Sequence, residues 1–279
     1  MLSILIPANN EADRIGICLA AILASSLPQA SGPRPEIIVI ANGCNDRTAT
    51  VALGYADEAR SKGWQLIVLS VPKGNKLNAL NIGDNRATNG IRIYLDADVI
   101  ISPLLVRQLH EVLKQSKPIY ASGTVIISNP ETWISRAYKR IYARVPFFTQ
   151  GVSGCGLFAV NEQGRARWAQ FPEIISDDTF VRLKFSPKER TRVPATYLWP
   201  IVEGFSNLVK VRRRQDIGVL QIAKRYPTLL QNDDKPQFSL MHTLKLATSD
   251  PIGFGVYAAV AIAVRIGGKK DTNNWSRGR

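Results

Sequence analysis

The feature that most constrains the fold is a regular alternation of short apolar runs and helix-like segments over the first third of the chain. The apolar runs are rich in β-branched residues and lie at 2–6, 36–40, 65–69 and 91–95, and the clearest helical segments are 15–23 and 99–113. This alternation predicts βαβ units, with helices on both faces of a mostly parallel sheet. Ligands bind at the carboxyl ends of the strands in such sheets, so the loops after these runs are the first candidates for a site.

The chain is long enough for one large domain, since it has 279 residues of which 45% are hydrophobic. Beyond residue 120 the pattern becomes mixed, with a strand-like run at 121–127, a helix-like stretch at 133–145 and a glycine-rich turn at 151–156. Linker-like composition appears at 231–236 and in the C-terminal tail. We therefore predict an α/β domain of two halves, 1–118 and 119–230, followed by a C-terminal extension, 231–279.

Two aspartates directly follow the fourth apolar run. Asp96 and Asp98 are two residues apart, so their carboxylates lie on the same side of an extended backbone. Mg²⁺ and Mn²⁺ prefer oxygen ligands and keep coordination positions for phosphate oxygens. The pair is therefore a candidate clamp for a cation and a nucleoside diphosphate. The alternative is an ordinary pair of surface aspartates.

Polar, turn-forming segments are also found before the fourth run. Pro7, Asn9 and Glu11 follow the first run, Asn42 ends the second, and Lys76 opens the helical segment that precedes the fourth. Together they offer amides, backbone N–H groups and an ammonium group to a nucleobase, a ribose and phosphates. Each segment can equally be a helix cap or a simple turn.

Taken in order, these segments resemble the family 2 glycosyltransferases, whose pattern runs Pro-x-x-Asn-Glu, Asp-Asp/Asn-Gly, Lys-x-x-Ala-Leu-Asn and Asp-x-Asp. The resemblance covers about the first hundred residues. It implies a GT-A fold with a Rossmann-like nucleotide-binding half and a mixed acceptor half, in an enzyme of the bacterial envelope or exopolysaccharide type. It also implies Mn²⁺ or Mg²⁺ as cofactor. The residues that it places at the nucleotide are Pro7, Asn9, Glu11, Asn42, Lys76 and Asp96, with Asp96 and Asp98 at the metal.

The resemblance continues at Asp177 and Asp178, which are similar to the family's Glu-Asp segment. In the family the second acidic residue is the catalytic base, which implies that Asp178 removes the acceptor proton in a displacement that inverts the anomeric centre. The adjacent Asp177 would tune the pKa of that base. The alternative is that both residues are the cap and first turn of a helix, where acidic side chains are favourable.

Two departures from the family pattern bear on the substrate. Residues 211–218 are similar to the family's Gln-x-x-Arg-Trp region, and Arg214 is the candidate for stabilising the departing diphosphate. Val211 and Gln215 replace its Gln and Trp, which favours addition of one sugar over processive polymerisation. Ala41 replaces the first Asp of the nucleobase loop, beside Asn42, and an amide bonds a base edge differently from a carboxylate. We favour a UDP-sugar and keep a GDP-sugar as the alternative.

The chain is strongly basic, with 36 Lys and Arg against 22 Asp and Glu and a net charge of +14. Such a charge favours polyanionic partners. Segment 133–145 places basic and apolar residues on opposite helical faces, and the apolar segment 252–266 precedes a basic tail. Both predict contact with an anionic membrane surface and a glycan or lipid-linked acceptor. The alternative is that the first helix packs on the core and the second is a buried terminal helix.

The expected location is the cytoplasm, on the inner face of the plasma membrane, because the three cysteines are widely spaced and the N-terminus has no basic leader. A basic nucleic-acid-binding protein is one alternative, but carboxylates at the strand ends would repel phosphates, so we expect no nucleic acid as partner. Nucleotidyl transfer on a similar fold is another. The chain lacks the glycine-rich, lysine-bearing N-terminal loop that such enzymes use.

Overall fold

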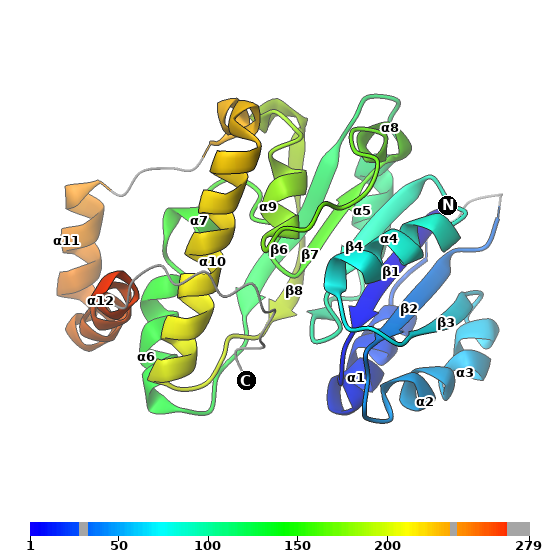
Figure 1. Ribbon diagram of the computed structural model, residues 1–279, viewed down its shortest axis with the longest axis horizontal. Coiled ribbons are helices and arrows are strands. Elements are labelled where there is room, and N and C mark those ends of the chain that lie inside the picture. The colour runs from blue at the N-terminus through cyan, green and yellow to red at the C-terminus, as the bar shows by residue number, and fades with distance from the viewer. Residues whose placement is uncertain (28–32, 235–238, 267–279) are drawn as a thin grey trace.

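The computed structural model describes residues 1–27, 33–234 and 239–266, and an eight-stranded sheet runs through its centre (Figure 1). The strand order is β3-β2-β1-β4-β7-β6-β8-β5. The strands are β1 (Leu2–Ala8), β2 (Glu36–Asn42), β3 (Gln65–Val71), β4 (Ile91–Leu95), β5 (Ile100–Ile101), β6 (Tyr120–Ile127), β7 (Leu157–Val160) and β8 (Arg190–Trp199). The α/β class and the mostly parallel sheet predicted from the sequence are confirmed.

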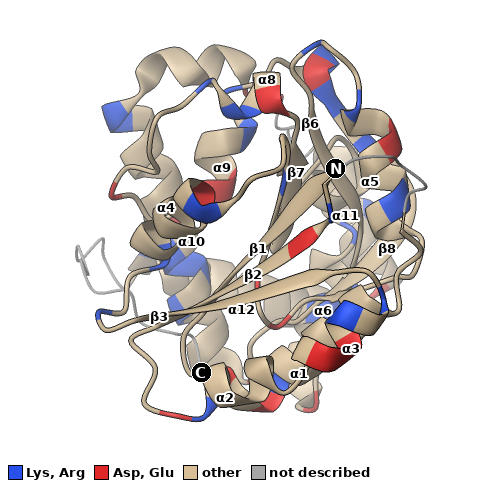
Figure 2. Cartoon of the chain, turned by 90° about the vertical axis from the view of Figure 1, so that its right-hand side faces the viewer, with Lys and Arg blue, Asp and Glu red and all other residues tan. Residues whose placement is uncertain are grey.

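The first four strands pair in parallel, at the positions predicted from the apolar runs. Their helices are α1 (Ala12–Leu23), α2 (Thr48–Leu53), α3 (Ala56–Ser61) and α4 (Lys76–Arg86). Figure 2 shows α4 on one face of these strands and α1, α2 and α3 on the other. Ile4 and Ile6 accordingly share a core with α1, whereas Leu5 packs with Leu80 of α4. Every residue of β2 is buried, because helices cover both faces.

The second half of the sheet is mixed, since β7 runs antiparallel to β4 and β6, while β6 and β8 are parallel. The segment 99–113, predicted as one helix, contains β5 and α5 (Leu105–Leu113) instead. The first part of that prediction was wrong because Ile100 and Ile101 pair with β8. Short helices complete this half: α7 (Pro146–Thr149), α8 (Glu162–Arg165), α9 (Asp177–Arg182) and η1 (Pro187–Glu189).

Three helices from distant parts of the chain pack together at one end of the sheet (Figure 1). They are α6 (Trp133–Tyr142), α10 (Phe205–Arg225) and α12 (Pro251–Ile266). Tyr138, Leu208 and Val260, one from each helix, form a shared buried cluster. The predicted amphipathic helix therefore exists, but protein covers its apolar face. Membrane contact through that face was a wrong prediction, and packing on the protein is the correct alternative.

The remaining C-terminal elements are η2 (Pro227–Asn232) and α11 (Leu240–Ser249). Across residues 1–27, 33–234 and 239–266, the helices are too short or too polar for any of them to cross a membrane. The basic tail, 267–279, lies outside the described residues.

Candidate active site

Two asparagines tie together the carboxyl ends of β1 and β2. Asn9 donates from Nδ2 to the carbonyl oxygens of Asn42 at 2.6 Å and Gly43 at 2.9 Å. The buried Asn42 amide donates to the Ala8 carbonyl at 2.9 Å and accepts the Asn75 backbone N–H at 3.0 Å. Both side chains thus hold the loops after β1 and β2 against the start of α4. These hydrogen bonds agree with the alternative that the two segments form simple turns. Contact of Asn9 and Asn42 with a nucleotide stays a prediction.

The loop after β2 approaches the start of α4 closely, and this approach requires glycine. Gly43 has a φ of 59°, and a side chain there would collide with the backbone of Gly74. Asn75 then caps α4 by accepting the backbone N–H of Asn78 at 3.0 Å. The first side chain of the helix is that of Lys76, which this cap fixes beside the strand ends.

A cavity of about 610 Å³ opens at this edge of the sheet, a volume typical of small-molecule sites. We refer to it as the larger cavity. Its lining includes every residue predicted for the nucleotide and the metal: Pro7, Asn9, Glu11, Asn42, Lys76, Asp96 and Asp98. Arg214 lines it from α10. The structure therefore brings these predicted residues together around one space.

A smaller cavity, of about 260 Å³, adjoins the larger one. The two share several lining residues, among them Lys76, Asp96 and Asp177. Asp178 belongs to the smaller cavity. Aromatic and apolar residues form another part of its wall, including Tyr142, Val145, Phe147, Trp199, Val219 and Tyr257, of which Tyr142 and Trp199 also line the larger cavity. The site thus has two compartments with carboxylates at their boundary.

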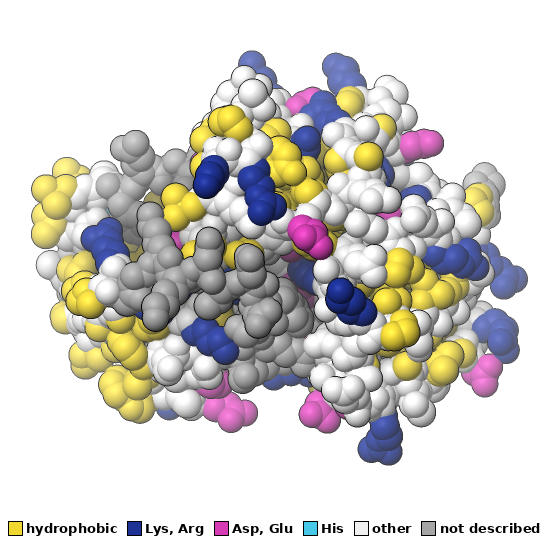
Figure 3. Space-filling view, viewed as in Figure 1, with side chains coloured by type: hydrophobic (Ala, Val, Ile, Leu, Met, Phe, Trp, Pro, Cys, Tyr) yellow, Lys and Arg dark blue, Asp and Glu magenta, His cyan; other side chains and the backbone are white. Residues whose placement is uncertain are grey.

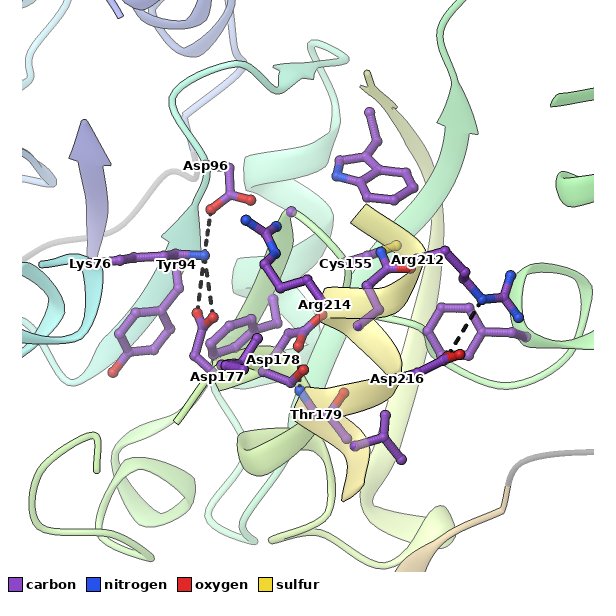
Figure 4. A pocket seen from close by; sticks show the side chains of 18 of the residues that line it. Lys76, Tyr94, Asp96, Cys155, Asp177, Asp178, Thr179, Arg212, Arg214 and Asp216 are labelled. Atoms are coloured by element: carbon purple, nitrogen blue, oxygen red, sulfur yellow. Dashed lines mark hydrogen bonds and ion pairs between the residues drawn. The ribbon is translucent and has the colours of Figure 1, made fainter. Parts of the chain in front are cut away.

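Lys76 bridges two of these carboxylates (Figure 4). Its Nζ lies 2.9 Å from Asp96 Oδ1, at the end of β4, and 3.1 Å from Asp177 Oδ2, in α9. Burial alone would lower the pKa of Lys76, but the carboxylates of Asp177 and Asp96 raise it above its ordinary value. The lysine is therefore a fixed positive charge between the two compartments.

Asp177 and Asp178 form the first turn of α9, as the helical alternative predicted. Asp178 Oδ1 accepts the backbone N–H of Thr179 at 2.6 Å. Burial and the negative charge of Asp177 raise the pKa of Asp178 to about 6, against the opposing charge of Lys76. A carboxylate with such a pKa is ionised at neutral pH and basic enough to accept a proton, so this position suits a general base.

The residues at the end of β4 fit a divalent cation that is shared with a ligand. Asp96 and Asp98 offer carboxylate oxygens to the larger cavity, and 34% of the Asp96 side chain is exposed. Within the described ranges, no group of three or more His, Cys, Asp or Glu residues could hold a metal. Phosphate and water oxygens would therefore complete the coordination, as Mg²⁺ and Mn²⁺ readily accept. The metal assignment stays a prediction.

Two arginines of α10 enter the site. Arg214 lines both cavities, and its side chain extends toward Asp96 in Figure 4. Arg212 lies 5.8 Å from the ring centre of Tyr142 and 6.0 Å from that of Tyr257, so it is part of the aromatic wall. The position of Arg214 is compatible with its predicted role of stabilising the departing diphosphate.

The family model described as Glycosyl transferase family 2 matches residues 3–166. The chain belongs to this family. The match takes in β1 to β7, and the sheet has the GT-A fold that family membership implies. Asp177, Asp178 and Arg214 lie beyond the matched residues, so their roles rest on geometry and on the motifs they resemble.

Two curated relatives match about half of this chain over a part of their own length. The dolichyl-phosphate beta-glucosyltransferase of Drosophila melanogaster is 30% identical over 132 residues, 46% of this chain and 40% of the relative. A poly-beta-1,6-N-acetyl-D-glucosamine synthase of Staphylococcus epidermidis is 27% identical over 145 residues, 52% of this chain and 33% of the relative. The chain therefore spans well under half the length of these relatives.

Solved structures with similar folds include two with bound nucleotides. Mannosyltransferase PcManGT from Pyrobaculum calidifontis, in complex with GDP-Man and Mn²⁺, has a TM-score of 0.62 and 18% identity over 96% of this chain and 75% of that one. TarS 1-349 from S. aureus, in complex with UDP, has a TM-score of 0.52 and 12% identity over 96% and 92%. At such identities these likenesses show the shared fold alone.

The sequence motifs did not predict the aromatic wall of the smaller cavity. Tyr142 ends a helix that the sequence marked only for its amphipathic pattern, and Tyr257 lies in the apolar segment near the C-terminus. Trp199 ends β8 at the sheet edge, and its position after a strand is the one signal that could have found it. No local pattern points to the other two.

Proposed function

We propose that this family 2 chain transfers a single sugar from a nucleoside-diphosphate sugar to an acceptor hydroxyl, with inversion. The observation that carries the proposal is the meeting of two cavities at Lys76, Asp96 and Asp177, with Asp178 on the side of the smaller one. A donor in the larger cavity and an acceptor in the smaller one would bring the anomeric carbon and the hydroxyl together at this boundary.

The larger cavity is the proposed donor site. Its nucleoside end is shaped by Pro7, Asn9, Glu11 and Asn42, and its diphosphate end by Lys76, Asp96, Asp98 and Arg214. Mn²⁺ or Mg²⁺ held by Asp96 and Asp98 would supply positive charge to the leaving diphosphate. The guanidinium of Arg214 adds hydrogen bonds to the phosphate oxygen on which charge grows.

Asp178 is the proposed base, with Asp177 as the neighbour that raises its pKa. The acceptor hydroxyl gives its proton to the Asp178 carboxylate while its oxygen bonds to the anomeric carbon. The bond from that carbon to the diphosphate oxygen breaks, and the nucleoside diphosphate leaves with the electron pair. A single displacement of this kind inverts the anomeric centre.

For the donor we propose a UDP-sugar, with a GDP-sugar as the alternative, and proteins of similar fold have been solved with each kind of nucleotide. For the acceptor we propose a glycan or a lipid-linked glycan of the cell envelope or of an extracellular polysaccharide. The names of the two relatives, one a dolichyl-phosphate enzyme and the other a polysaccharide synthase, support this class.

The proposed location is the cytoplasmic face of the plasma membrane, with α11 and α12 in contact with anionic lipid. Large apolar side chains are exposed on both helices, with Met241 81% and Leu240 76% exposed on α11 and Ile266 79% exposed on α12. Figure 3 shows hydrophobic side chains gathered at this end of the molecule. The net charge of +14 suits an anionic surface. Tyr257 of α12 also lines the smaller cavity, which supports delivery of a membrane-bound acceptor from this side.

Calorimetric titration with UDP, GDP, CDP and dTDP, each with and without Mn²⁺ or Mg²⁺, tests the donor site. Metal-dependent binding of one nucleotide supports the proposal, and no binding by any of them would refute it. Product analysis then separates sugar transfer, which releases a nucleoside diphosphate, from nucleotidyl transfer, which releases pyrophosphate. Tight, salt-resistant binding to duplex DNA would instead favour the nucleic-acid alternative.

Flotation with vesicles that contain anionic lipid tests the membrane contact. We expect the wild-type chain to float and the Leu240→Ser/Met241→Ser variant to float much less. Leu53→Ser is the matched control, because Leu53 is 57% exposed but lies on α2. A wild-type chain that stays at the bottom of the gradient would contradict the membrane proposal.

A further inference from the structure

The position of Lys76 has a consequence for how a cation reaches the donor site. Its ammonium group contacts Asp96 at 2.9 Å and Asp177 at 3.1 Å, and only 22% of the lysine side chain is exposed. Asp96 is also one of the two carboxylates proposed to hold the divalent cation. The Asp96 carboxylate would therefore contact both the ammonium group of Lys76 and the divalent cation.

Electrostatics makes this double use unfavourable. A divalent cation on Asp96 and an ammonium group about 3 Å from the same carboxylate would repel each other strongly in a partly buried site. The lysine in turn offsets the mutual repulsion of Asp96, Asp177 and Asp178, which all line the smaller cavity. Lys76 thus offsets part of the negative charge of the site before any ligand arrives.

We propose that Lys76 is an internal counter-ion that a divalent cation must displace from Asp96. The inference rests on the proposed donor site. Displacement becomes favourable when the donor binds as well, because the diphosphate gives the ammonium group a new partner while Asp177 keeps its contact. The cation alone therefore binds weakly, and cation and nucleotide strengthen each other's binding through Lys76. Lys76 thus acts on the metal indirectly, through its ion pair with Asp96, and is a positioning residue.

A purely structural ion pair makes the opposite prediction. If Lys76 only holds β4 and α9 together, its removal disorders Asp96 and weakens metal binding. If it competes with the metal, its removal strengthens metal binding, even though the fold loses an ion pair. The sign of the change in Mn²⁺ affinity therefore separates the two roles.

Mn²⁺ binding, followed by electron paramagnetic resonance without nucleotide, is the test. We expect Lys76→Met to bind Mn²⁺ about tenfold more tightly than wild type, or more, because a competing charge is gone. Lys73→Met is the control, because Lys73 is an exposed lysine in the loop before α4. The Mn²⁺ affinity of this variant should match that of wild type. We also expect UDP or GDP to strengthen Mn²⁺ binding in wild type and to do so much less in Lys76→Met.

Repulsion among the three carboxylates could unfold Lys76→Met, so a second variant carries the same test. Lys76→Met/Asp177→Asn removes one charge of each sign, and it should also bind Mn²⁺ more tightly than wild type. Unchanged or weaker Mn²⁺ affinity in the folded variants would overturn the inference. If wild type binds Mn²⁺ with nucleotide and Asp98→Ala does not, the donor site stands even when this inference fails. If neither metal nor nucleotide binds any variant, the proposed function itself fails, and this inference with it.

Discussion

The two compartments of the site are built in different ways. The larger cavity alone is lined by residues at and after the ends of β1 and β2, namely Asn9, Glu11 and Asn42, and the bonds of Asn9 and Asn42 join loops within the first 75 residues. The smaller cavity alone is lined by α7 and α12, through Phe147 and Tyr257, while residues of α6 and α10 line both cavities. The two compartments thus share part of their wall, and each also has lining residues of its own.

This difference predicts that the two compartments can be altered separately. Changes at residues that line only the larger cavity should act on nucleotide and metal binding, whereas changes at residues that line only the smaller cavity should act on the acceptor. Asp178 lies on the acceptor side of the boundary, although its pKa depends on charges at the boundary itself. Variants of each side therefore test whether the division is real.

The largest effect is expected from Asp178→Asn. An amide cannot accept the acceptor proton, so turnover should fall about 10²- to 10⁴-fold, while the nucleotide Kd stays within about twofold. Steady-state kinetics and nucleotide titration measure the two quantities. Asp216→Asn is the control, because Asp216 also lines the smaller cavity but its side chain is 54% exposed, and it should keep most of its turnover. An equal loss of donor binding in Asp178→Asn would remove the division between the compartments.

The next effect belongs to the donor side. Asp98→Ala removes one of two proposed metal ligands, so the metal-dependent part of nucleotide affinity should fall about tenfold or more. Calorimetry with and without Mn²⁺ measures it. Asp57→Ala replaces an aspartate whose side chain is 93% exposed, and it should bind like wild type. Nucleotide binding that is strengthened by Mn²⁺ to the same degree in Asp98→Ala would rule out this ligand.

The pH profile tests the boundary. The pKa of Asp178 is raised to about 6 by burial and by Asp177, and the reaction needs the ionised form. Turnover should therefore be level above pH 6 and fall about tenfold per unit below it. Asp177→Asn should move this acid limb to lower pH. An acid limb that stays at the same pH in Asp177→Asn would show that a group other than Asp178 controls it.

Because the folded-state pKa of Asp178 lies above the ordinary value, the stability contribution of Asp178 should also decrease as pH rises from about 4 to 6.

The sequence predicted the residues that gather at the larger cavity far better than the aromatic residues that line the smaller one, and the reason is physical. Apolar runs mark the strands, and the carboxyl ends of parallel strands must meet at one edge, so residues as distant as Pro7 and Asp98 could be placed together. Tyr142 and Tyr257 reach the smaller cavity through the packing of α6 and α12, which leaves no periodic signal, and Trp199 was not singled out although it ends β8. The two-residue strand β5 was missed for a similar reason, because only its pairing with β8 distinguishes it from a helix start.

A smaller effect is expected from filling the acceptor compartment. Val219 of α10 is 38% exposed and lines the smaller cavity, so Val219→Trp should fold and occupy part of that space. We expect the acceptor KM to rise several-fold with little change in nucleotide Kd. Leu220→Trp is the matched control, because Leu220 is 45% exposed on the same helix and should leave both constants unchanged. A larger change in nucleotide Kd than in acceptor KM would place the donor in the smaller cavity instead.

The smallest effect is expected at the joint between α6 and α12. Asp250 accepts Arg140 Nε at 2.6 Å and caps α12 through the Gly253 backbone N–H at 2.9 Å. Asp250→Ala removes these two bonds and a third, from Arg140 Nη2 at 3.0 Å, and should lower the free energy of unfolding by about 1 kcal/mol. Because α12 carries Tyr257 into the acceptor wall, the acceptor KM should rise about twofold while nucleotide Kd is unchanged. Thermal unfolding and steady-state kinetics measure these changes. Glu58→Ala is the control, because it removes an exposed ion pair between Glu58 of α3 and Lys62, the residue that follows α3. If Asp250→Ala weakened nucleotide binding as much as acceptor binding, α12 would affect both compartments, and the contrast between them would be wrong.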